Sequence, residues 1–173
     1  MDLIGINSGG TFAATSRPLP EVTRSVIEST VRLYERVGWV KPWIGYLAFE
    51  NDECVGTCAF TSAPRNDVVE IAYFTFPGHE GLGVATRMAE CLVSMASMSA
   101  PAVSVTAHTL PQENASTRVL RKSGFVFTGP VIHAQDGPIW VWRYEGKGSL
   151  PTHSQDPAPE PGVPPAGQRP HRP

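Results

Sequence analysis

The stretch 70–96, EIAYFTFPGHEGLGVATRMAECLVSMA, determines the fold expected for this chain. A run rich in β-branched and aromatic residues ends at Pro77, a glycine-rich turn covers 78–83, and a helical pattern begins directly after Gly83. The order strand, tight turn, helix leaves the first N–H groups of the helix without intrahelical partners, at the positive end of the helix dipole. Because such a helix start binds anions, the sequence predicts a phosphate-bearing ligand at this turn.

Upstream of this stretch, the pattern predicts one helix followed by a three-stranded meander. Apolar residues recur at three- and four-residue spacing from Glu21 onward, and Gly38 ends the helix. The segment 3–6 is expected to form a short strand near the N-terminus. Apolar runs joined by short turns predict three consecutive antiparallel strands, at 43–49, 54–61 and 68–76.

Downstream, the helix that starts at 84 is expected to stop before Pro101. The remaining pattern predicts a strand at 102–107, a helix at 113–122 and two last strands at 125–127 and 139–144. Together these elements predict an α+β fold, in which helices flank a mixed, mostly antiparallel central sheet.

Composition divides the chain into a folded domain at 1–145 and a tail at 146–173. The tail is rich in proline and has almost no large apolar residue, so we expect it to be disordered with polyproline character. Two interpretations of the tail stay open, a docking segment for proline-binding modules and an extension without a role.

The bulk numbers favour a soluble protein. Hydrophobic residues make up 41% of the 173 residues and charged residues 17%, and the net charge of −2 gives no reason to expect nucleic-acid binding. No apolar run approaches the roughly 20 residues that span a membrane, and no signal peptide is evident, so we expect a cytoplasmic location. The cysteines Cys54, Cys58 and Cys91 are too few for a disulfide framework and are expected to be small buried residues, with no metal site.

A dinucleotide-binding fold is excluded as an explanation of the glycine-rich turn. Such a site needs a third glycine at position 86 and an acid about 20 residues later. Thr86 occupies that position, and no acid occurs between Glu90 and Glu113.

Two motifs together resemble those of the GNAT acetyltransferases, in particular the branch that acetylates the N-termini of ribosomal proteins. The first, PGHEGLGVAT at 77–86, is similar to the pyrophosphate loop of that family. The second, NASTRVLRKSGF at 114–125, is similar to the family's helix beside the pantetheine arm. The segment EIAY at 70–73 resembles the start of that branch's fourth strand.

The resemblance implies acetyl-CoA as co-substrate and assigns residues to its binding. Arg118 is expected to contact a CoA phosphate or to lie on a solvated helix face. Two of the assigned residues, Asn114 and Ser116, have an alternative interpretation as helix-capping residues. The assigned residues are the strand-end residues Tyr73, Phe74 and Thr75, the loop residues His79, Glu80, Gly81, Leu82, Gly83, Val84, Ala85 and Thr86, and Asn114 with Ser116.

For catalysis, a GNAT-type reaction needs a group that removes a proton from the acceptor amine. Glu70 is the preferred candidate, acting directly or through water, and His108 at the end of the following strand is the rival candidate, ahead of His79. A structural ion pair is the alternative role for Glu70. Many GNAT proteins place a tyrosine general acid at the position of Leu120, so this chain lacks that candidate.

The resemblance implies N-acetylation of a primary amine, either a protein N-terminus or a small molecule, without a metal. A GNAT-like module that binds CoA or a partner protein without catalysis is the alternative, and a homodimer through edge strands is possible. The region 18–43 is expected to shape the acceptor pocket, with Trp39, Trp43 and Tyr46 either lining it or belonging to the core.

Overall fold

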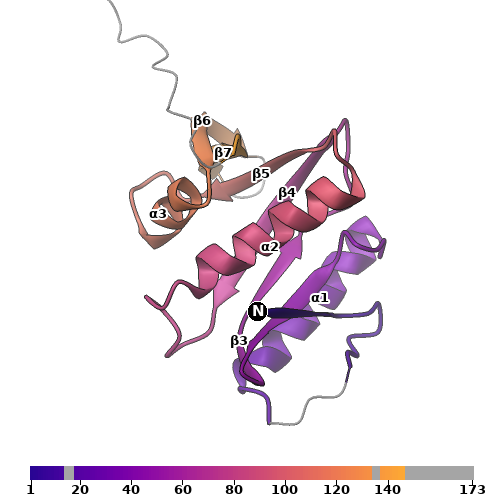
Figure 1. Ribbon diagram of the computed structural model, residues 1–173. Coiled ribbons are helices and arrows are strands. Elements are labelled where there is room, and N and C mark those ends of the chain that lie inside the picture. The colour runs from indigo at the N-terminus through magenta and orange to yellow at the C-terminus, as the bar shows by residue number, and fades with distance from the viewer. Residues whose placement is uncertain (14–17, 134–136, 147–173) are drawn as a thin grey trace, which may run out of the picture.

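The computed structural model describes residues 1–13, 18–133 and 137–146, in which one seven-stranded sheet carries three helices (Figure 1). The helices are α1 (Val22–Val37), α2 (Val84–Ser99) and α3 (Ala115–Lys122). The strands are β1 (Asp2–Gly5), β2 (Gly45–Glu50), β3 (Glu53–Phe60), β4 (Val68–Thr75), β5 (Ser104–Thr109), β6 (Phe125–His133) and β7 (Gly137–Tyr144). Their order in the sheet is β1-β2-β3-β4-β5-β7-β6, which confirms the predicted α+β class. The predicted tail lies outside the described residues from 147 onward.

Strands β1 to β4 are antiparallel neighbours, which confirms the predicted meander. The turn between β2 and β3 has positive φ at both central residues, 50° at Asn51 and 62° at Asp52. Asn and Asp tolerate this left-handed conformation better than most residues, and its twist matches that of the flanking strands. The short turn therefore sets the register of the hairpin.

Strand β6 is longer than its sequence predicts. The apolar run ends at Phe127, but the strand continues to His133 and pairs with β7 through a register shift at Phe127–Gly129. Gly129 and Pro130 interrupt the strand pattern in the sequence. An edge strand accommodates both residues because one of its sides needs no hydrogen bonds, and β6 is the last strand of the sheet.

The central feature of the sheet is the parallel pair β4–β5. The pairing covers Val68–Ile71 with Ser104–Ala107 and then stops, although β4 continues to Thr75. On the other side of β4, the carbonyl of Glu70 and the N–H of Phe76 form hydrogen bonds with backbone groups of the β3 segment. Because peptide groups alternate along a strand, those of Tyr73 and Thr75 point to the side on which β5 no longer pairs. The strands therefore separate where β4 ends.

Two glycines bring helices close to opposite faces of the sheet. A Cβ on Gly45 would lie 2.7 Å from Thr30 Cγ2 of α1, and a Cβ on Gly56 would lie 3.1 Å from Met88 Cε of α2. The register places Gly45 opposite Ala59 and Gly56 opposite Thr75, so the two glycines belong to different faces. Helix α1 thus covers one face and α2 the other (Figure 1).

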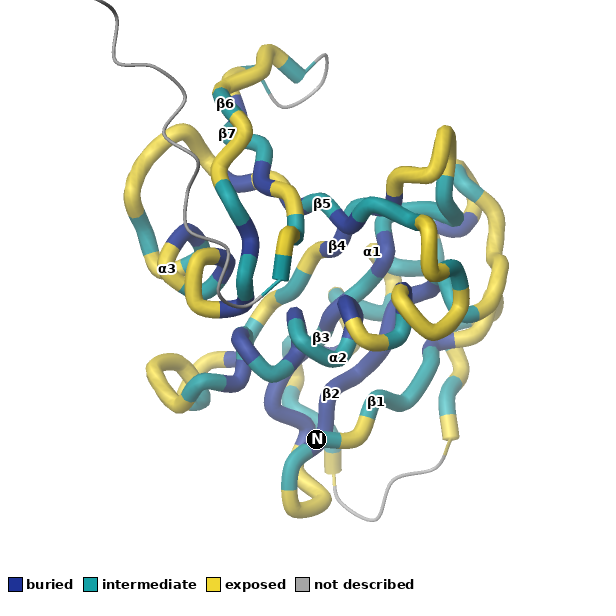
Figure 2. The backbone as a smooth tube through the Cα atoms, turned by 45° about the horizontal axis from the view of Figure 1, so that its top comes forward, coloured by how far each residue is buried: buried dark blue, intermediate teal, exposed yellow. Residues whose placement is uncertain are grey.

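The hydrophobic core lies mainly between the sheet and α2, where Figure 2 shows the buried segments of the backbone. The predicted apolar stripe of α2 is fully buried at Met88 and Leu92, while Cys91 is half-buried. Cys54 and Cys58 are free and buried, as predicted. None of the helices in the described ranges is both long and apolar enough to cross a membrane.

A buried tyrosine hydroxyl attaches α1 to the sheet. Tyr34 Oη donates to the carbonyl of Ile6 at 2.9 Å and accepts from the N–H of Gly45 at 2.8 Å. Burial raises the pKa of Tyr34, so the hydroxyl stays protonated and keeps its donor role. This contact fixes the distance between the C-terminal half of α1 and the start of β2.

The Tyr34→Phe variant should therefore be less stable than the wild type. It leaves the buried Gly45 N–H without its acceptor, which costs about 1–3 kcal/mol in the free energy of unfolding. Tyr144→Phe, at a half-buried tyrosine that packs on Phe125, is the matched control and should change that energy by at most about 0.5 kcal/mol. Urea unfolding of both variants measures the difference, and equal stabilities would contradict the anchoring role.

Candidate functional site

A cavity of about 500 Å³ opens between the end of β4, the start of α2 and the exposed side of α3. It brings together most of the residues that the sequence assigned to cofactor binding, although they come from three separate elements. The residues that line it are Tyr73, Phe74, Thr75, His79, Glu80, Gly81, Gly83, Val84, Ala85, Thr86, Ala115, Ser116, Arg118, Val119 and Lys122.

The loop at the start of α2 presents its backbone rather than its side chains. Gly81 and Gly83 have φ values of 77° and 79°, in the left-handed region that favours glycine. No side chain caps the helix at Gly83, so the first-turn N–H groups remain available to a ligand. The Val84 and Thr86 side chains are buried, which leaves the backbone of this turn on the cavity side. This geometry suits an anion.

Polar contacts hold the loop against the β2–β3 hairpin. Arg87 Nη2 donates to Glu50 Oε2 at 2.9 Å, and Arg87 Nη1 donates to the carbonyl of Leu82 at 3.1 Å. His79 Nε2 lies 3.7 Å from Glu53 Oε1. Because Glu50 and Glu53 flank the hairpin turn, these contacts connect the loop with the turn at two places.

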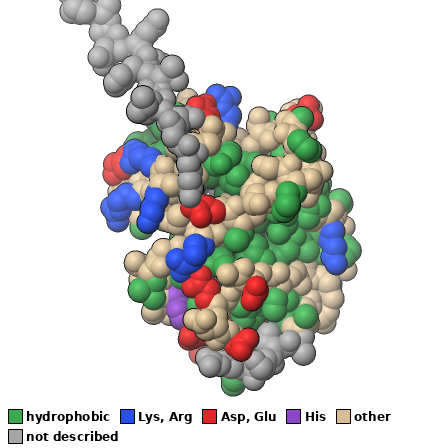
Figure 3. All heavy atoms as spheres, viewed as in Figure 1, with side chains coloured by type: hydrophobic (Ala, Val, Ile, Leu, Met, Phe, Trp, Pro, Cys, Tyr) green, Lys and Arg blue, Asp and Glu red, His purple; other side chains and the backbone are tan. Residues whose placement is uncertain are grey.

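The charges at the cavity are mixed. Glu80 lines it, and its Oε2 accepts a hydrogen bond from the N–H of Gly78 at 2.7 Å, so one donor of the loop is already occupied. On the opposite wall, α3 contributes Arg118 and Lys122. Figure 3 shows that Lys and Arg side chains gather over α3. The two cations and the start of α2 outweigh the single carboxylate.

Strand β4 forms the inner end of the cavity. The peptide groups of Tyr73 and Thr75 point to the side where β5 has separated. Tyr73 Oη donates to the carbonyl of Ser116 at 3.3 Å and so connects β4 with α3. Burial raises the pKa of Tyr73, which keeps this donor protonated.

Two of the predicted cofactor-binding residues do not line the cavity. Asn114 caps α3: its side chain accepts from the N–H of Thr117 at 3.1 Å, and its own N–H donates to Thr117 Oγ1 at 3.1 Å. The capping alternative is therefore the one observed for Asn114. The Leu82 side chain is 64% exposed, and only its carbonyl has a structural role, as the acceptor from Arg87.

The two candidate bases lie together. His108 Nδ1 is 3.1 Å from Glu70 Oε1, and Thr61 Oγ1 donates to Glu70 Oε2 at 3.4 Å. The ring of His133 lies 6.2 Å from that of His108. Glu70 faces the same side of the sheet as Ala72, which is the side that α1 covers. Both side chains of the pair are about 30% exposed, 31% for Glu70 and 29% for His108.

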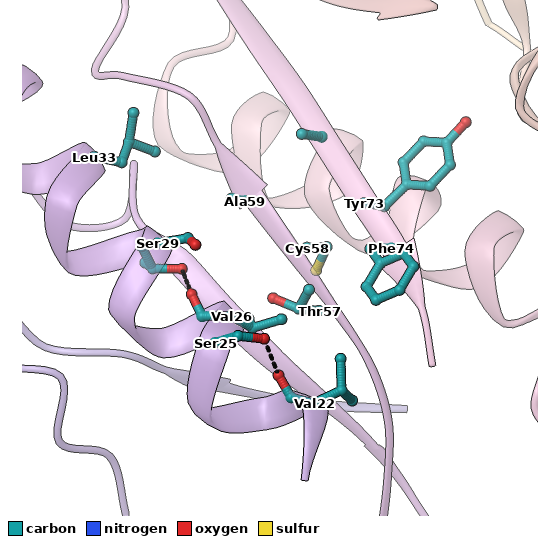
Figure 4. A pocket seen from close by; sticks show the side chains of 12 residues that line it. Val22, Ser25, Val26, Ser29, Leu33, Thr57, Cys58, Ala59, Tyr73 and Phe74 are labelled. Atoms are coloured by element: carbon teal, nitrogen blue, oxygen red, sulfur yellow. Dashed lines mark hydrogen bonds between the residues drawn. The ribbon is translucent and has the colours of Figure 1, made fainter. Parts of the chain in front are cut away.

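A second cavity, of about 360 Å³, lies between α1 and strands β3 and β4 (Figure 4). It shares two lining residues, Tyr73 and Phe74, with the first cavity. In Figure 4, Phe74 points toward α1 and Tyr73 points away from it. The residues that line the second cavity are Val22, Ser25, Val26, Ser29, Thr30, Leu33, Thr57, Cys58, Ala59, Ala72, Tyr73 and Phe74.

The three aromatic residues that the sequence assigned either to the acceptor pocket or to the core line neither of the two cavities. Trp43 packs edge-on against Phe60, with ring centroids 4.9 Å apart. Tyr46 is buried and donates to the carbonyl of Pro42, and Trp39 Nε1 donates to the carbonyl of Ile6. Helix α1, which lines the second cavity, lies within the region 18–43 that was expected to shape the acceptor pocket.

Sequence reasoning missed two features of the site. Lys122 follows Arg118 by one helical turn, and this spacing would have placed both cations on one face of α3. The Arg87–Glu50 pair spans 37 residues, and no local pattern identifies it. Within the described residues, no group of three or more His, Cys, Asp or Glu side chains is arranged to hold a metal ion.

Comparisons with known proteins agree with this geometry. The family model described as "Acetyltransferase (GNAT) domain" matches residues 12–126. The ribosomal-protein-serine acetyltransferase of Escherichia coli (strain K12) is 25% identical over 116 residues, which cover 66% of this chain and 63% of that protein. The chain therefore spans less than two thirds of the length of that relative.

Solved structures show the same fold. The ribosomal L7/L12 α-N-protein acetyltransferase RimL, in complex with coenzyme A, has a TM-score of 0.56 at 20% identity, with 71% of each chain covered. An aminoglycoside acetyltransferase in complex with coenzyme A has a TM-score of 0.52 at 22% identity, with 60% of this chain and 66% of that chain covered.

The Arg87–Glu50 pair predicts a pH-dependent contribution to stability. Hydrogen bonds from Arg87 hold the pKa of Glu50 below its usual range, against a smaller opposing effect of desolvation. A carboxylate with a lowered folded-state pKa stabilises the protein above its unfolded-state pKa of about 4.3, and this effect is lost as the pH falls through the folded-state pKa. Glu50→Gln should therefore lower the free energy of unfolding at neutral pH and lose this effect in acid.

Urea unfolding of wild type and Glu50→Gln across this pH range measures the effect. Arg87→Gln provides the control background, because without the guanidinium the further change Glu50→Gln should have no comparable pH dependence. An equal loss of stability at neutral and acid pH would contradict the ion-pair explanation.

Proposed function

The chain belongs to the GNAT acetyltransferase family, and on this premise we propose that it transfers the acetyl group of acetyl-CoA to a primary amine. The observation that carries the proposal is that the two cavities share the lining residues Tyr73 and Phe74, at the end of β4 where β5 no longer pairs with it. One cavity has the features of a phosphate and pantetheine site, and the other is open to an acceptor. A catalyst for group transfer needs both reactants at one point.

The residues around the first cavity fit acetyl-CoA. Its pyrophosphate would accept hydrogen bonds from the N–H groups of the loop and of the first turn of α2. Arg118 and Lys122 would add positive charge at the same wall. The free peptide groups of Tyr73 and Thr75 would bond the pantetheine amides in the manner of an added β-strand.

The Glu70–His108 pair is proposed to take the proton from the acceptor amine. An Nδ1–H of His108 donated to Glu70 leaves Nε2 as the proton acceptor, and the carboxylate then stabilises the imidazolium that forms. The pair lies on the α1 side of the sheet. Glu70 precedes Ala72, a lining residue of the second cavity, by two residues and shares its face of β4. The proton would thus leave on the side from which the amine enters.

When bound, acetyl-CoA supplies a thioester whose carbonyl carbon the deprotonated amine attacks. The N–H groups at the free end of β4 are proposed to stabilise the negative charge that develops on the carbonyl oxygen. Leu120 is fully buried and takes no part, so a proton for the leaving thiolate must come from water or another residue.

Binding of acetyl-CoA is tested by calorimetry on wild type and Gly83→Glu. At φ +79° a side chain is strained, its Cβ would lie 3.0 Å from Arg87 Nη1, and the carboxylate would repel the phosphates. We expect the affinity to fall roughly tenfold to hundredfold. Gly137→Glu, at φ +72° in open space on β7, is the matched control and should bind as the wild type does. Absence of binding by the wild-type protein would overturn the proposed function.

Catalysis by the Glu70–His108 pair is tested by thiol release. Glu70→Gln and His108→Gln should each lower kcat/KM roughly 100-fold, and the double variant should lose little more, because the two residues act as a unit. The Kd for acetyl-CoA should stay unchanged, as it should in the control Glu35→Gln, an exposed acid of α1. Full turnover by Glu70→Gln with an unchanged pH profile would show that this carboxylate is not part of the proton acceptor.

A further inference from the structure

One face of the hairpin formed by β6 and β7 is apolar and lies open at the edge of the sheet opposite β1 (Figure 1). Phe127 is 41% exposed and Ile132 is 77% exposed, although both are large apolar side chains. The register between the strands places the members of this face side by side, and none of them lines either cavity. We call it the outer hairpin face, and it consists of Phe127, Pro130, Ile132, Pro138 and Trp140.

Two aromatic rings give this face its shape. The ring centroids of Phe127 and Trp140 lie 5.1 Å apart at an interplanar angle of 55°, so the rings are tilted against each other. The indole N–H of the buried Trp142 donates to Thr109 Oγ1 at 3.0 Å. The indole N–H of Trp140 has no acceptor among the residues that the structure describes, although such a group usually has one. The face therefore combines apolar ring surface with one available donor.

That combination suits a polyproline II segment. Such a segment docks in aromatic-lined grooves, and its carbonyl groups have no internal hydrogen bonds, so they can accept from an indole N–H. Eight of the 27 residues in 147–173 are proline, and five of these lie in 157–165. The stretch PGVP at 161–164 has the spacing of a PxxP motif. The chain thus contains a segment of the right chemistry for this face.

The chain leaves the sheet close to the outer hairpin face. The N–H of Glu145 donates to the carbonyl of Gly124 at 3.0 Å, so the end of β7 lies beside the start of β6. Gly146 has a φ of 101°, a backbone conformation that favours glycine. Trp140 precedes Gly146 by six residues, which is about 20 Å along a strand, whereas residues 147–156 can span about 33 Å. The proline run 157–165 can therefore return to this face.

We propose that the segment 157–165 docks on the outer hairpin face of its own chain as a polyproline II helix, with Trp140 donating to one of its carbonyl groups. A short tether keeps the segment at an effective concentration of about millimolar, so it outcompetes a second copy of the chain at micromolar concentration. The docked segment covers apolar side chains on an edge strand, and such faces otherwise promote association between copies. This site is separate from both cavities and does not depend on the proposed function.

Photo-cross-linking in the full chain tests the docking. The probe p-benzoylphenylalanine replaces Ile132, which tolerates the change because it is exposed, and mass spectrometry maps the products after irradiation. We expect cross-links to 157–165 within one chain, with a yield that stays constant between roughly 1 and 100 μM protein. The same probe at the exposed Val40, between α1 and β2, is the control and should give at least roughly fivefold less of this product. Cross-links between two copies, or none to 157–165, would overturn the proposal.

A variant of the full chain in which serine replaces every proline of 157–165 tests the chemistry of the contact. It keeps the length of the tether but loses the pre-organised polyproline conformation, so the cross-link yield from position 132 should fall at least roughly fivefold. Ala158→Ser combined with Ala166→Ser is the matched control and should leave the yield unchanged. An equal yield in the proline variant would contradict docking by a polyproline helix.

The indole N–H signal of Trp140 in NMR spectra gives a second readout, which does not need the probe. In isotope-labelled full chain this signal should shift when the prolines are replaced, whereas that of Trp142, which already donates to Thr109, should stay in place. Trp140→Phe identifies the signal by its disappearance. An unchanged Trp140 signal in the proline variant would overturn the proposal, whatever the cross-linking gives.

Discussion

The site depends on one constraint of the sheet: β4 and β5 pair in parallel over 68–71 and 104–107 and then separate. A strand that loses its neighbour exposes a row of peptide groups, and an extended ligand can replace that neighbour. The peptide groups of Tyr73 and Thr75 are in this position. Because side chains alternate along β4, Tyr73 points toward α3 while Phe74 points toward α1. One short strand end therefore contributes residues to both cavities.

Close packing of the helices sets the shape of both cavities. Gly45 lets α1 pack closely on the sheet, and Gly56 does the same for α2, because a Cβ at either position would press on a helix side chain. Tyr34 fixes α1 by hydrogen bonds to Ile6 and Gly45. The loop before α2 is held through Arg87 and Glu50 at the hairpin turn. The walls of the site thus belong to helices and strands that these contacts hold against the sheet.

Local sequence patterns predicted the features that depend on local physics. The glycine loop, the start of α2 and the β2–β3 turn were all predicted, because φ preferences and helix periodicity act over a few residues. The contact of Glu70 with His108 depends on the register between β4 and β5, which no short pattern encodes. Whether Trp39, Trp43 and Tyr46 line a pocket or belong to the core also depends on contacts between distant segments, and none of the three lines the cavity beside α1.

The separation of charge between the two cavities has a consequence for the reaction. An amine close to phosphate groups would hold its proton more tightly, because nearby negative charge stabilises the ammonium form. In this fold the loop that is proposed to bind phosphate lies at the start of α2, whereas Glu70 and His108 lie on the face that α1 covers. Arg118, Lys122 and the helix N-terminus would also offset much of the phosphate charge. Under the proposed function, the field of the co-substrate would therefore oppose deprotonation of the amine less at the Glu70–His108 pair.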